Sequence, residues 1–355
     1  MKKILAVSTA LSGVAFAAQA DITVLSWGGA YETSQVEAYN KPFAASTGIG
    51  VNMAAADNPA TPIKAQVEAG NVSVDVADIE YSDAVRLCDE GLLEVLAIDE
   101  LPDGVDGTPA AEDFIPGGLT DCAVASIVWS TVVAYNANSI EGVGTIADFF
   151  DLEKFPGKRG LRKGAKANLE MALMADGVAG PEVYEVLATP EGVDRAFAKL
   201  DTIKGDTVWW EAGAQPQQLL ADGEVVMTTG YNGRVFAAAV GEGQPFSILW
   251  DGQILDFDLF VIPKGAPNKD EAWEYIKFAT ASEQLAAQAT WISYGPARLS
   301  SAPLVGLFMD GVTEMGPHMP TAPDNLTNYI VNDFEFWADR DVELNERFNA
   351  WLVAN

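Results

Sequence analysis

Histidine and cysteine are almost absent from this sequence, which contains only His318, Cys88 and Cys122. Two cysteines and one histidine do not provide the ligands of an ordinary zinc site. The sequence also has no Gly-x-Ser-x-Gly motif and no zinc-binding helix motif, so a secreted hydrolase has little support. We therefore expect no metal, no cofactor and no enzymatic activity.

Basic residues are scarce as well. The chain has 21 Lys and Arg against 51 Asp and Glu, a formal net charge of −30. This excess of negative charge argues against nucleic acid and anionic membranes as partners. It permits a cationic ligand, but acidity spread along a chain is as often a device for solubility.

Long apolar runs are missing except near the N-terminus. A short basic start is followed by an apolar run over residues 4–18 and by the small-x-small sequence Ala18-Gln19-Ala20. This pattern is typical of a secretory signal peptide, and the run lacks the length and flank of a membrane anchor. We interpret residues 1–20 as the signal peptide of a periplasmic protein that begins at Asp21.

Export from the cytoplasm predicts that the two cysteines are oxidised. Thiols oxidise outside the cytoplasm, and no third cysteine competes. We expect Cys88 and Cys122 to form a structural disulfide, worth about 3 to 4 kcal/mol in the chain-entropy model.

Strand and helix patterns alternate along the chain. The first predicted strands are residues 21–27, 51–53 and 74–79. Helical segments separate them, which predicts an α/β fold with a mostly parallel sheet. One helical segment covers residues 32–43, and a second strand and helix set follows over residues 192–229, with a strand at 207–210. Two long apolar strands, 123–135 and 255–262, lie beside these sets, and an amphipathic run covers residues 325–352. Two such strands indicate a hinge between two lobes.

Two carboxylates interrupt the second long strand. Alternation puts Asp256 and Asp258 on one face and their apolar neighbours Phe257 and Leu259 on the other. Carboxylates are rarely placed beside apolar strand residues without a partner. Either both carboxylates stand in water at the strand's end, or they face a polar site that requires negative charge.

Several longer motifs support the second alternative. They are DVADIEYSDAVRLCDEGLLE (75–94), DLEKFPGKRGLRK (151–163), LLADGEVVMTTGYNGR (219–234), DFDLFVIPKGAPN (256–268) and YGPAR (294–298). Their order resembles the periplasmic substrate-binding proteins of ABC transporters, specifically the spermidine/putrescine-binding group, over essentially the whole mature chain. The resemblance implies a monomer that binds a small-molecule amine and delivers it to the permease subunits of the inner membrane, without catalysis.

The fold that the resemblance implies is the type II periplasmic binding protein fold. Each of its two lobes is a mixed, mostly parallel sheet flanked by helices, and two hinge strands join the lobes. We expect lobe 1 to comprise residues 21–126 and 257–300, and lobe 2 to comprise residues 127–256 and 301–355.

The resemblance also implies ligand-binding positions. The aromatic positions are Trp27, Tyr31, Tyr231 and Tyr294; Tyr81 lies beside a polar position; and the carboxylates for an ammonium are Glu170 and Asp258. This combination suits an alkyl-ammonium ligand, because aromatic rings offer both apolar contact and cation–π attraction and carboxylates offer charge-assisted hydrogen bonds.

We predict that the remaining tryptophans lie either in the core or at the cleft. Alternation in Trp209-Trp210 points one ring to the core and the other to the cleft, and we place Trp210 beside Glu211 at the cleft. The tryptophans expected in the core are Trp129, Trp273, Trp291 and Trp337.

Arg234 departs from the polyamine-binding pattern, because our alignment places it where diamine binders carry a second carboxylate. A guanidinium would repel an ammonium but can hold a carboxylate by two parallel hydrogen bonds. We place a polyamine first, because most of the acidic and aromatic positions match, and this ligand requires Arg234 to turn away and pair with Asp256 or Glu211. The alternative, if Arg234 faces the cleft, is a zwitterionic ω-amino acid or a related compound with an amine and an anionic group, whose amine lies at Asp258.

Two other classes have weaker support. Asp256 and Asp258 could serve a glycosidase, but nothing around them predicts a sugar site. An iron-binding transport protein would need a cluster of Tyr, His and carboxylates, and His318 lies in a Pro/Gly/Met-rich segment typical of a surface loop.

Overall fold

The computed structural model describes residues 20–354, so nearly all of the predicted signal peptide lies outside the described residues. Within these described residues, ten strands form one sheet, in which the main order is β2-β1-β3-β8-β4-β7-β5-β6. The strands are β1 (Ile22–Ser26), β2 (Val51–Ala55), β3 (Val76–Glu80), β4 (Ala123–Asn136), β5 (Arg159–Arg162), β6 (Thr207–Trp210), β7 (Met227–Tyr231), β8 (Phe246–Val261), β9 (Gly295–Pro296) and β10 (Tyr329–Val331).

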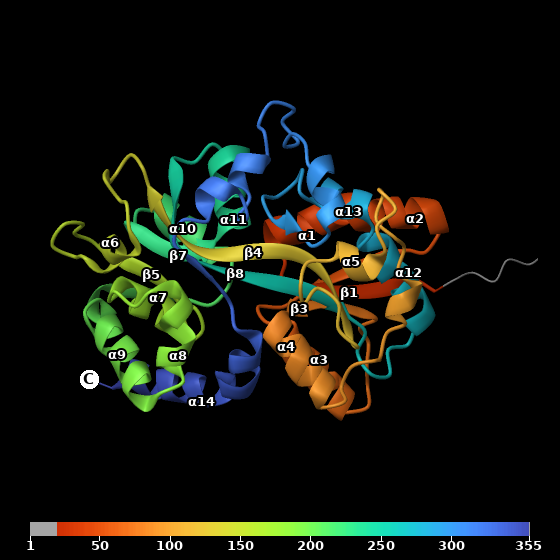
Figure 1. Ribbon diagram of the computed structural model, residues 1–355, viewed down its shortest axis with the longest axis horizontal. Helices are drawn as coiled ribbons and strands as arrows, with labels where there is room; N and C mark the ends of the chain where they lie inside the picture. Colours follow the sequence, from red (N-terminus) through yellow and green to blue (C-terminus); the bar gives the residue numbers. More distant parts are fainter. Residues whose placement is uncertain (1–19, 355) are drawn as a thin grey trace, which may run out of the picture.

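The two long strands β4 and β8 run through both halves of the molecule (Figure 1). They pair antiparallel with each other from Ala123 opposite Val261 to Asn136 opposite Phe246. On one side β8 pairs with β3, and on the other β4 pairs with β7. The register shifts twice, between Ala125 and Ile127 and again between Thr131 and Val133. Each half is therefore a parallel three-stranded sheet that ends on an antiparallel crossing strand.

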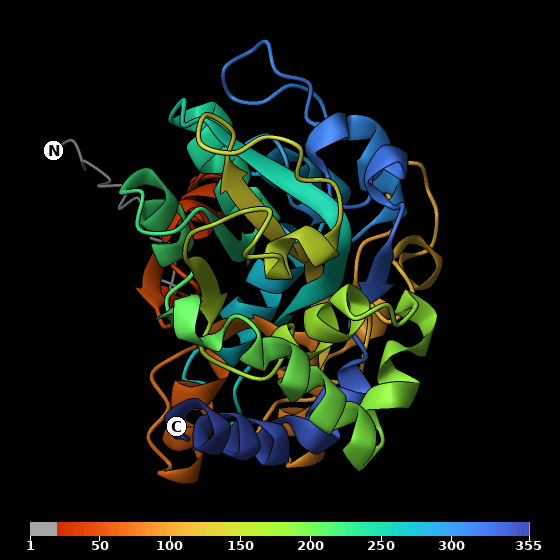
Figure 2. The same ribbon diagram turned by 90° about the vertical axis from the view of Figure 1, so that its left-hand side faces the viewer.

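Helices cover both halves of this sheet, as the two ribbon views show (Figures 1 and 2). They are α1 (Gly29–Gln35), α2 (Lys41–Thr47), α3 (Ala60–Glu68), α4 (Tyr81–Asp89), α5 (Ala110–Asp113), α6 (Ile146–Phe150), α7 (Asn168–Ala175), α8 (Val183–Leu187), α9 (Pro190–Asp201), α10 (Gln215–Ala221), α11 (Asn232–Phe236), α12 (Lys269–Ala279), α13 (Ser282–Gln288) and α14 (Phe334–Val353). A π-helical turn, Val36–Asn40, joins α1 to α2, so the helix predicted near residues 32–43 is part of a longer helical segment.

Each half of the molecule has its own large hydrophobic core. One packs β1, β3 and the start of β4 against α12, and includes Tyr39, Phe260 and Tyr275. The other packs α7 and α9 against the C-terminal helix, and includes Trp337 and Phe348. The predicted α/β architecture of two lobes joined by two long strands is confirmed, because β4 and β8 connect two parallel halves of the sheet and each half has its own core.

The C-terminal region differs from its prediction. The sequence predicts one amphipathic run over residues 325–352, whereas the structure forms strand β10 first and then α14. β10 pairs parallel with β8, with Ile330 opposite Ile254. Helix α14 then packs against α4 of the other half, so the C-terminal segment ties the two lobes together.

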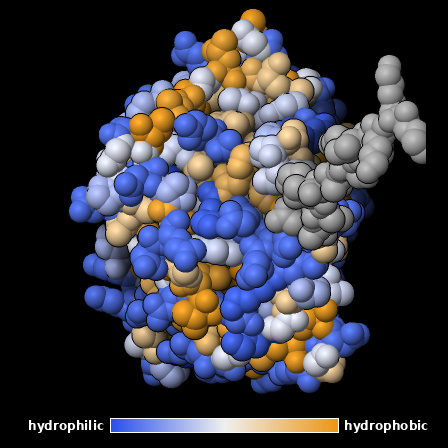
Figure 3. Space-filling view, turned by 90° about the vertical axis from the view of Figure 1, so that its right-hand side faces the viewer, coloured by the Kyte–Doolittle hydropathy of each residue, from blue (hydrophilic) through white to orange (hydrophobic). Residues whose placement is uncertain are grey.

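The predicted disulfide between Cys88 and Cys122 is present, and it links the end of α4 to the segment that enters β4. Hydrophilic side chains cover much of the face shown in Figure 3, and apolar side chains form small separate patches between them. Among the described residues, no helix is both long enough and apolar enough to cross a bilayer.

Candidate ligand-binding site

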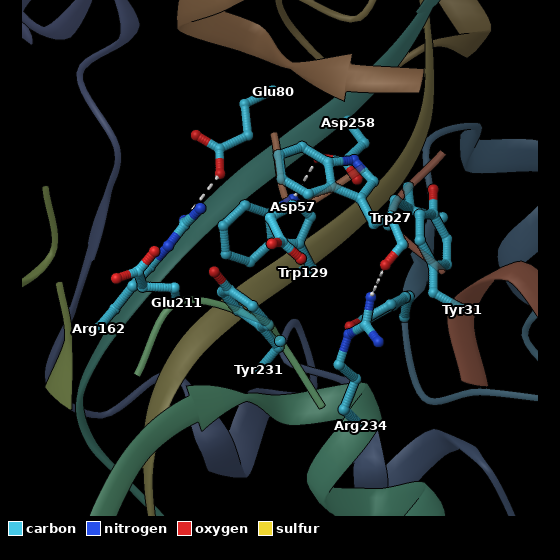
Figure 4. Close-up of a pocket in the computed structure, with 13 residues that line it drawn as sticks. Trp27, Tyr31, Asp57, Glu80, Trp129, Arg162, Glu211, Tyr231, Arg234 and Asp258 are labelled. Atoms are coloured by element: carbon cyan, nitrogen blue, oxygen red, sulfur yellow. Dashed lines mark hydrogen bonds and ion pairs between the residues drawn. The ribbon is translucent and has the colours of Figure 1, made fainter. Parts of the chain in front are cut away.

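A cavity, which we call the outer cavity, lies where the carboxyl ends of the parallel strands of both lobes meet. Trp27 follows β1, Glu80 ends β3 and Arg162 ends β5. Glu211 follows β6 and Tyr231 ends β7. Open α/β sheets bind ligands at this edge, because side chains that follow the strands converge there without being needed for the core. Figure 4 shows these residues facing one another across the cavity.

Asp258 is the central carboxylate of the outer cavity. It lies on β8, opposite Glu80 of β3 and Ile127 of β4, and is only 4% exposed. The indole N–H of Trp129 donates to its Oδ1 at 2.8 Å. Burial, followed by the carboxylates of Asp78 and Glu80, raises the pKa of Asp258 well above its usual range. A cation brought to this carboxylate would reverse these effects.

Asp78 lies behind Asp258 and is fully buried. Its carboxylate accepts hydrogen bonds from Nε2 of Gln35 at 2.5 Å and from the Ser26 hydroxyl at 3.5 Å. Burial raises the pKa of Asp78 to about 7, and these hydrogen bonds only partly oppose the increase. Within residues 20–354, no lysine, arginine or histidine forms an ion pair with Asp78 or Asp258.

A second pair of acids, Glu80 and Asp256, is neutralised by the protein itself. The ammonium of Lys166 lies 2.8 Å from Oε2 of Glu80 and 2.8 Å from Oδ2 of Asp256. The guanidinium of Arg162 lies 3.5 Å from Oε1 of Glu80. Although burial opposes the change, Lys166 and Arg162 lower the pKa of Glu80. Burial also lowers the pKa of Lys166, but Asp256 and Glu80 outweigh it and raise that pKa.

Aromatic rings form the walls of the outer cavity. Trp129 meets Tyr231 edge to face at 5.1 Å between ring centroids, and Tyr31 meets Tyr294 at 5.3 Å. The Nε1 of Trp27 and the hydroxyl of Tyr31 have no hydrogen-bond partner among the described residues. The cavity thus offers ring faces for a methylene chain and spare polar atoms for a ligand.

Arg234 provides the positive charge at the other end of the cavity. It lies on α11, is 7% exposed, and donates from its guanidinium to the carbonyl of Trp27 at 3.0 Å. A Cβ on Gly29 would come within 2.7 Å of the Arg234 guanidinium, so the glycine, with φ +64°, allows this approach. Arg234 forms no ion pair with Asp256 or Glu211, which pair instead with Lys166 and Lys163.

The structure brings most of the predicted site residues together. Those that line the outer cavity are Trp27, Tyr31, Glu211, Tyr231, Arg234, Asp258 and Tyr294. Trp210 and Asp256 line an adjoining cavity instead. Trp209 packs against Phe348 and Trp351, as expected for the core-facing member of its pair.

Two predicted ligand residues line neither of these two cavities. Tyr81 begins α4 and stacks on Phe334 of α14, with ring centroids 3.9 Å apart. The Glu170 carboxylate is fully buried and accepts hydrogen bonds from Trp337 at 2.6 Å and from Tyr184 at 3.1 Å. Burial raises the pKa of Glu170 to about 7. Both side chains have structural partners, so we do not retain them as ligand contacts.

The sequence missed three important residues of the cavity. Trp129, predicted for the core, is buried but also lines the cavity, because its ring lies on the face of β4 that carries the Asp258 contact. Arg162 ends the four-residue strand β5, which is too short to recognise from periodicity. Glu80 ends β3 and immediately precedes Tyr81, so the carboxylate itself is the polar position beside Tyr81 that the resemblance indicates.

The other tryptophans predicted for the core differ in exposure. Trp337 is fully buried, whereas Trp273 and Trp291 are only half-buried. His318 packs on Phe236 with ring centroids 4.8 Å apart. The described residues contain no group of three or more His, Cys, Asp or Glu side chains that could hold a metal ion.

Comparisons with known proteins identify the family to which the chain belongs. Residues 38–321 match the family described as bacterial extracellular solute-binding protein. The chain is 45% identical over 349 residues to a gamma-aminobutyric acid-binding protein of Pseudomonas aeruginosa, covering 97% of this chain and 95% of that protein. It is 24% identical over 269 residues to a putrescine-binding periplasmic protein of Escherichia coli, covering 68% and 70%. A solved structure of a GABA receptor is 34% identical with a TM-score of 0.79, covering 94% of this chain and 98% of that chain.

Proposed function

The chain belongs to the bacterial extracellular solute-binding proteins of ABC transporters, which bind small molecules for membrane permeases and are not enzymes, and we propose that its ligand is a zwitterionic ω-amino acid of the 4-aminobutyrate type. In this proposal the ligand's ammonium lies at Asp258 and its carboxylate at Arg234. The methylene chain between them packs on the aromatic walls of the outer cavity.

The observation that carries the proposal is the difference in charge between the two ends of the outer cavity. Asp258 and Asp78 form a buried acidic pair without an ion-pair partner among residues 20–354. A buried carboxylate of this kind is costly unless a cation joins it. Arg234, at the opposite end, uses a hydrogen bond to a carbonyl and forms no ion pair within the described chain. A ligand with one charge of each sign satisfies both ends.

The relatives favour the same ligand class. Two of the similar proteins are named for gamma-aminobutyric acid, at 45% and 34% identity, whereas the putrescine-binding protein is 24% identical over a shorter stretch. A diamine would put its second ammonium close to Arg234, and like charges repel strongly in a poorly hydrated cavity. These points support the amino acid over the polyamine that the sequence resemblance places first.

The remaining details of the function are part of the proposal. After cleavage of residues 1–20, the protein works as a periplasmic monomer. Lobe 1 (21–126 and 257–300) and lobe 2 (127–256 and 301–355) close on the ligand through the crossing strands. The two separate hydrophobic cores support this division.

Calorimetric titration with 4-aminobutyrate and with putrescine tests the proposal. The wild-type protein should bind 4-aminobutyrate more tightly, and Arg234→Ala should weaken that binding at least about tenfold because a charge-assisted pair is lost. Arg195→Ala is the matched control, because Arg195 pairs with Asp176 on the surface. Tighter binding of putrescine than of 4-aminobutyrate by the wild-type protein would refute the proposal.

A further inference from the structure

A second cavity, which we call the inner compartment, adjoins the outer cavity. Glu80, Trp129, Arg162 and Tyr231 line both of them. The two cavities therefore meet at these four side chains, which Figure 4 labels. A ligand four carbons long that spans Asp258 and Arg234 uses only the outer cavity, so the inner compartment has no role in the function proposed above.

Two hydrogen-bond donors of the inner compartment have no partner among the described residues. One is Nε1 of Trp210, a residue that is 2% exposed, and the other is Nδ2 of Asn332, which is 4% exposed. The hydroxyl of Tyr184 lies 3.1 Å from Oδ1 of Asn332 and 3.1 Å from Oε1 of Glu170, and its single proton can be donated to only one of them. Buried donors without a partner are rare in proteins, and two in one compartment indicate a group that brings an acceptor.

The charges around the inner compartment indicate that this acceptor is uncharged. Lys166 is shared between Glu80 and Asp256, and Arg162 also approaches Glu80. Two cations and two carboxylates thus neutralise one another within the wall. A further charge of either sign would have to compete with one of these pairs, whereas a hydroxyl or carboxamide oxygen would not.

A strained backbone conformation in the wall of the inner compartment also indicates a binding site. Ala167, which lines the compartment immediately before α7, has a φ of +68° and is the only non-glycine residue among those described with a positive φ. Such strain costs about 1–3 kcal/mol in folded proteins and clusters where a ligand or a switch requires it.

The β8 strand defines the direction in which a ligand would enter. Asp258 lines the outer cavity and Asp256 lines the inner compartment. Both lie on the same face of β8, since residues two apart in a strand point the same way and are roughly 7 Å apart. A substituent on the nitrogen held at Asp258 would therefore extend past Trp129 toward Asp256.

We propose that the inner compartment is a second subsite, which takes an uncharged hydroxyl or carboxamide group carried on the amine of the ligand. The substrate class then extends from 4-aminobutyrate to N-substituted ω-amino acids, in which a secondary ammonium stays at Asp258. The acceptor oxygen of the substituent is bound by Nε1 of Trp210 and Nδ2 of Asn332. This inference rests on the proposed function, because it uses the same ammonium position.

Two synthetic ligands of equal length test the inference. They are 4-(3-hydroxypropylamino)butanoate and 4-(butylamino)butanoate, which differ only in a terminal hydroxyl against a methyl group. Calorimetry on the wild-type protein should show at least about tenfold tighter binding of the hydroxyl compound, because a site built to hydrogen-bond an oxygen rejects the analogue that lacks it. Trp210→Phe should reduce this ratio to within about threefold, and Asn332→Ala, which removes the other donor, should also reduce it.

The outcomes separate this inference from the function on which it rests. If 4-aminobutyrate itself does not bind the wild-type protein, the proposed function and the second subsite are both refuted. If 4-aminobutyrate binds but the two probes bind equally well or not at all, the second subsite is refuted alone. Thermal melts of both variants identify any loss of folding, and a ratio that stays tenfold in a folded Trp210→Phe and a folded Asn332→Ala also overturns the inference.

Discussion

Two acidic pairs lie side by side on the same strands, and the protein treats them in opposite ways. Glu80 and Asp256 share Lys166 at 2.8 Å each, whereas no residue in 20–354 forms an ion pair with Asp78 or Asp258. All four carboxylates are buried. The first pair is therefore part of the architecture, and the second pair is left for a cation from outside the chain. Burial alone does not mark a binding residue; a buried acid that faces a cavity and has no ion-pair partner in the protein does.

The largest expected effect follows the removal of Lys166, which would make Glu80 and Asp256 resemble Asp78 and Asp258. Lys166→Met leaves Glu80 and Asp256 buried without their shared ammonium, so the free energy of unfolding should fall by about 3 to 5 kcal/mol at neutral pH. Urea denaturation measures this change. The matched control is Lys163→Met, because Lys163 pairs with Glu211 on the surface and should contribute at most about 1 kcal/mol. Equal losses in the two variants would show that the buried pair is not neutralised as described.

Asp78→Asn tests the second acidic pair, Asp78 and Asp258. The folded protein holds the pKa of Asp78 at about 7, above the ordinary value of 3.8. Between these values the folded state binds more protons than the unfolded state, so this group's contribution to stability falls as pH rises from about 4 to 7, by up to about 4 kcal/mol. Asparagine does not titrate and can still accept the hydrogen bond from Gln35. The variant should therefore gain stability relative to wild type as pH rises.

Thermal melts at pH 4.5 and pH 8 measure this gain. Asp222→Asn, a change at an exposed position, serves as the control. A stability difference between Asp78→Asn and wild type that is the same at both pH values would exclude the raised pKa.

The smallest expected effect concerns the positive end of the cavity. In Gly29→Ala the new methyl group must displace the Arg234 guanidinium, which a Cβ would approach to 2.7 Å. Binding of 4-aminobutyrate should weaken by about 1 to 2 kcal/mol, in addition to a similar cost in stability from the positive φ. Gly70→Ala is the control, because Gly70 has nearly the same φ, +63°, and nothing within 4 Å of its Cβ. Equal ligand affinity in the two variants would show that Gly29 does not help to position Arg234.

The sequence predicted the fold well because the fold depends on long, regular patterns. The crossing strand predicted at residues 123–135 is β4 (Ala123–Asn136), and the strand predicted at Thr207–Trp210 is β6. Apolar runs bounded by turn residues carry this information locally. The predicted disulfide followed from export and from the small number of cysteines.

The site was less predictable because its electrostatics depend on contacts across the fold. Lys166 neutralises Asp256 from 90 positions away in the chain, which no local pattern records. Without that contact Asp256 and Asp258 look equivalent, and the sequence assigned both to the ligand. Glu170 was assigned by resemblance, but Trp337 and Tyr184 occupy its carboxylate. Partners remote in sequence decide whether a buried acid is structural or free.

The central claim is that Asp258, and not its neutralised neighbour Asp256, receives the ligand's ammonium. Calorimetric titration of 4-aminobutyrate into Asp258→Asn and Asp256→Asn, two variants that each remove one charge from the same face of β8, tests it most directly. We predict that Asp258→Asn loses about 2 to 5 kcal/mol of binding free energy, at least about thirtyfold in affinity. Asp256→Asn should lose stability but remain within about tenfold of wild-type affinity. Equal losses of affinity, or a larger loss in Asp256→Asn, would contradict the account.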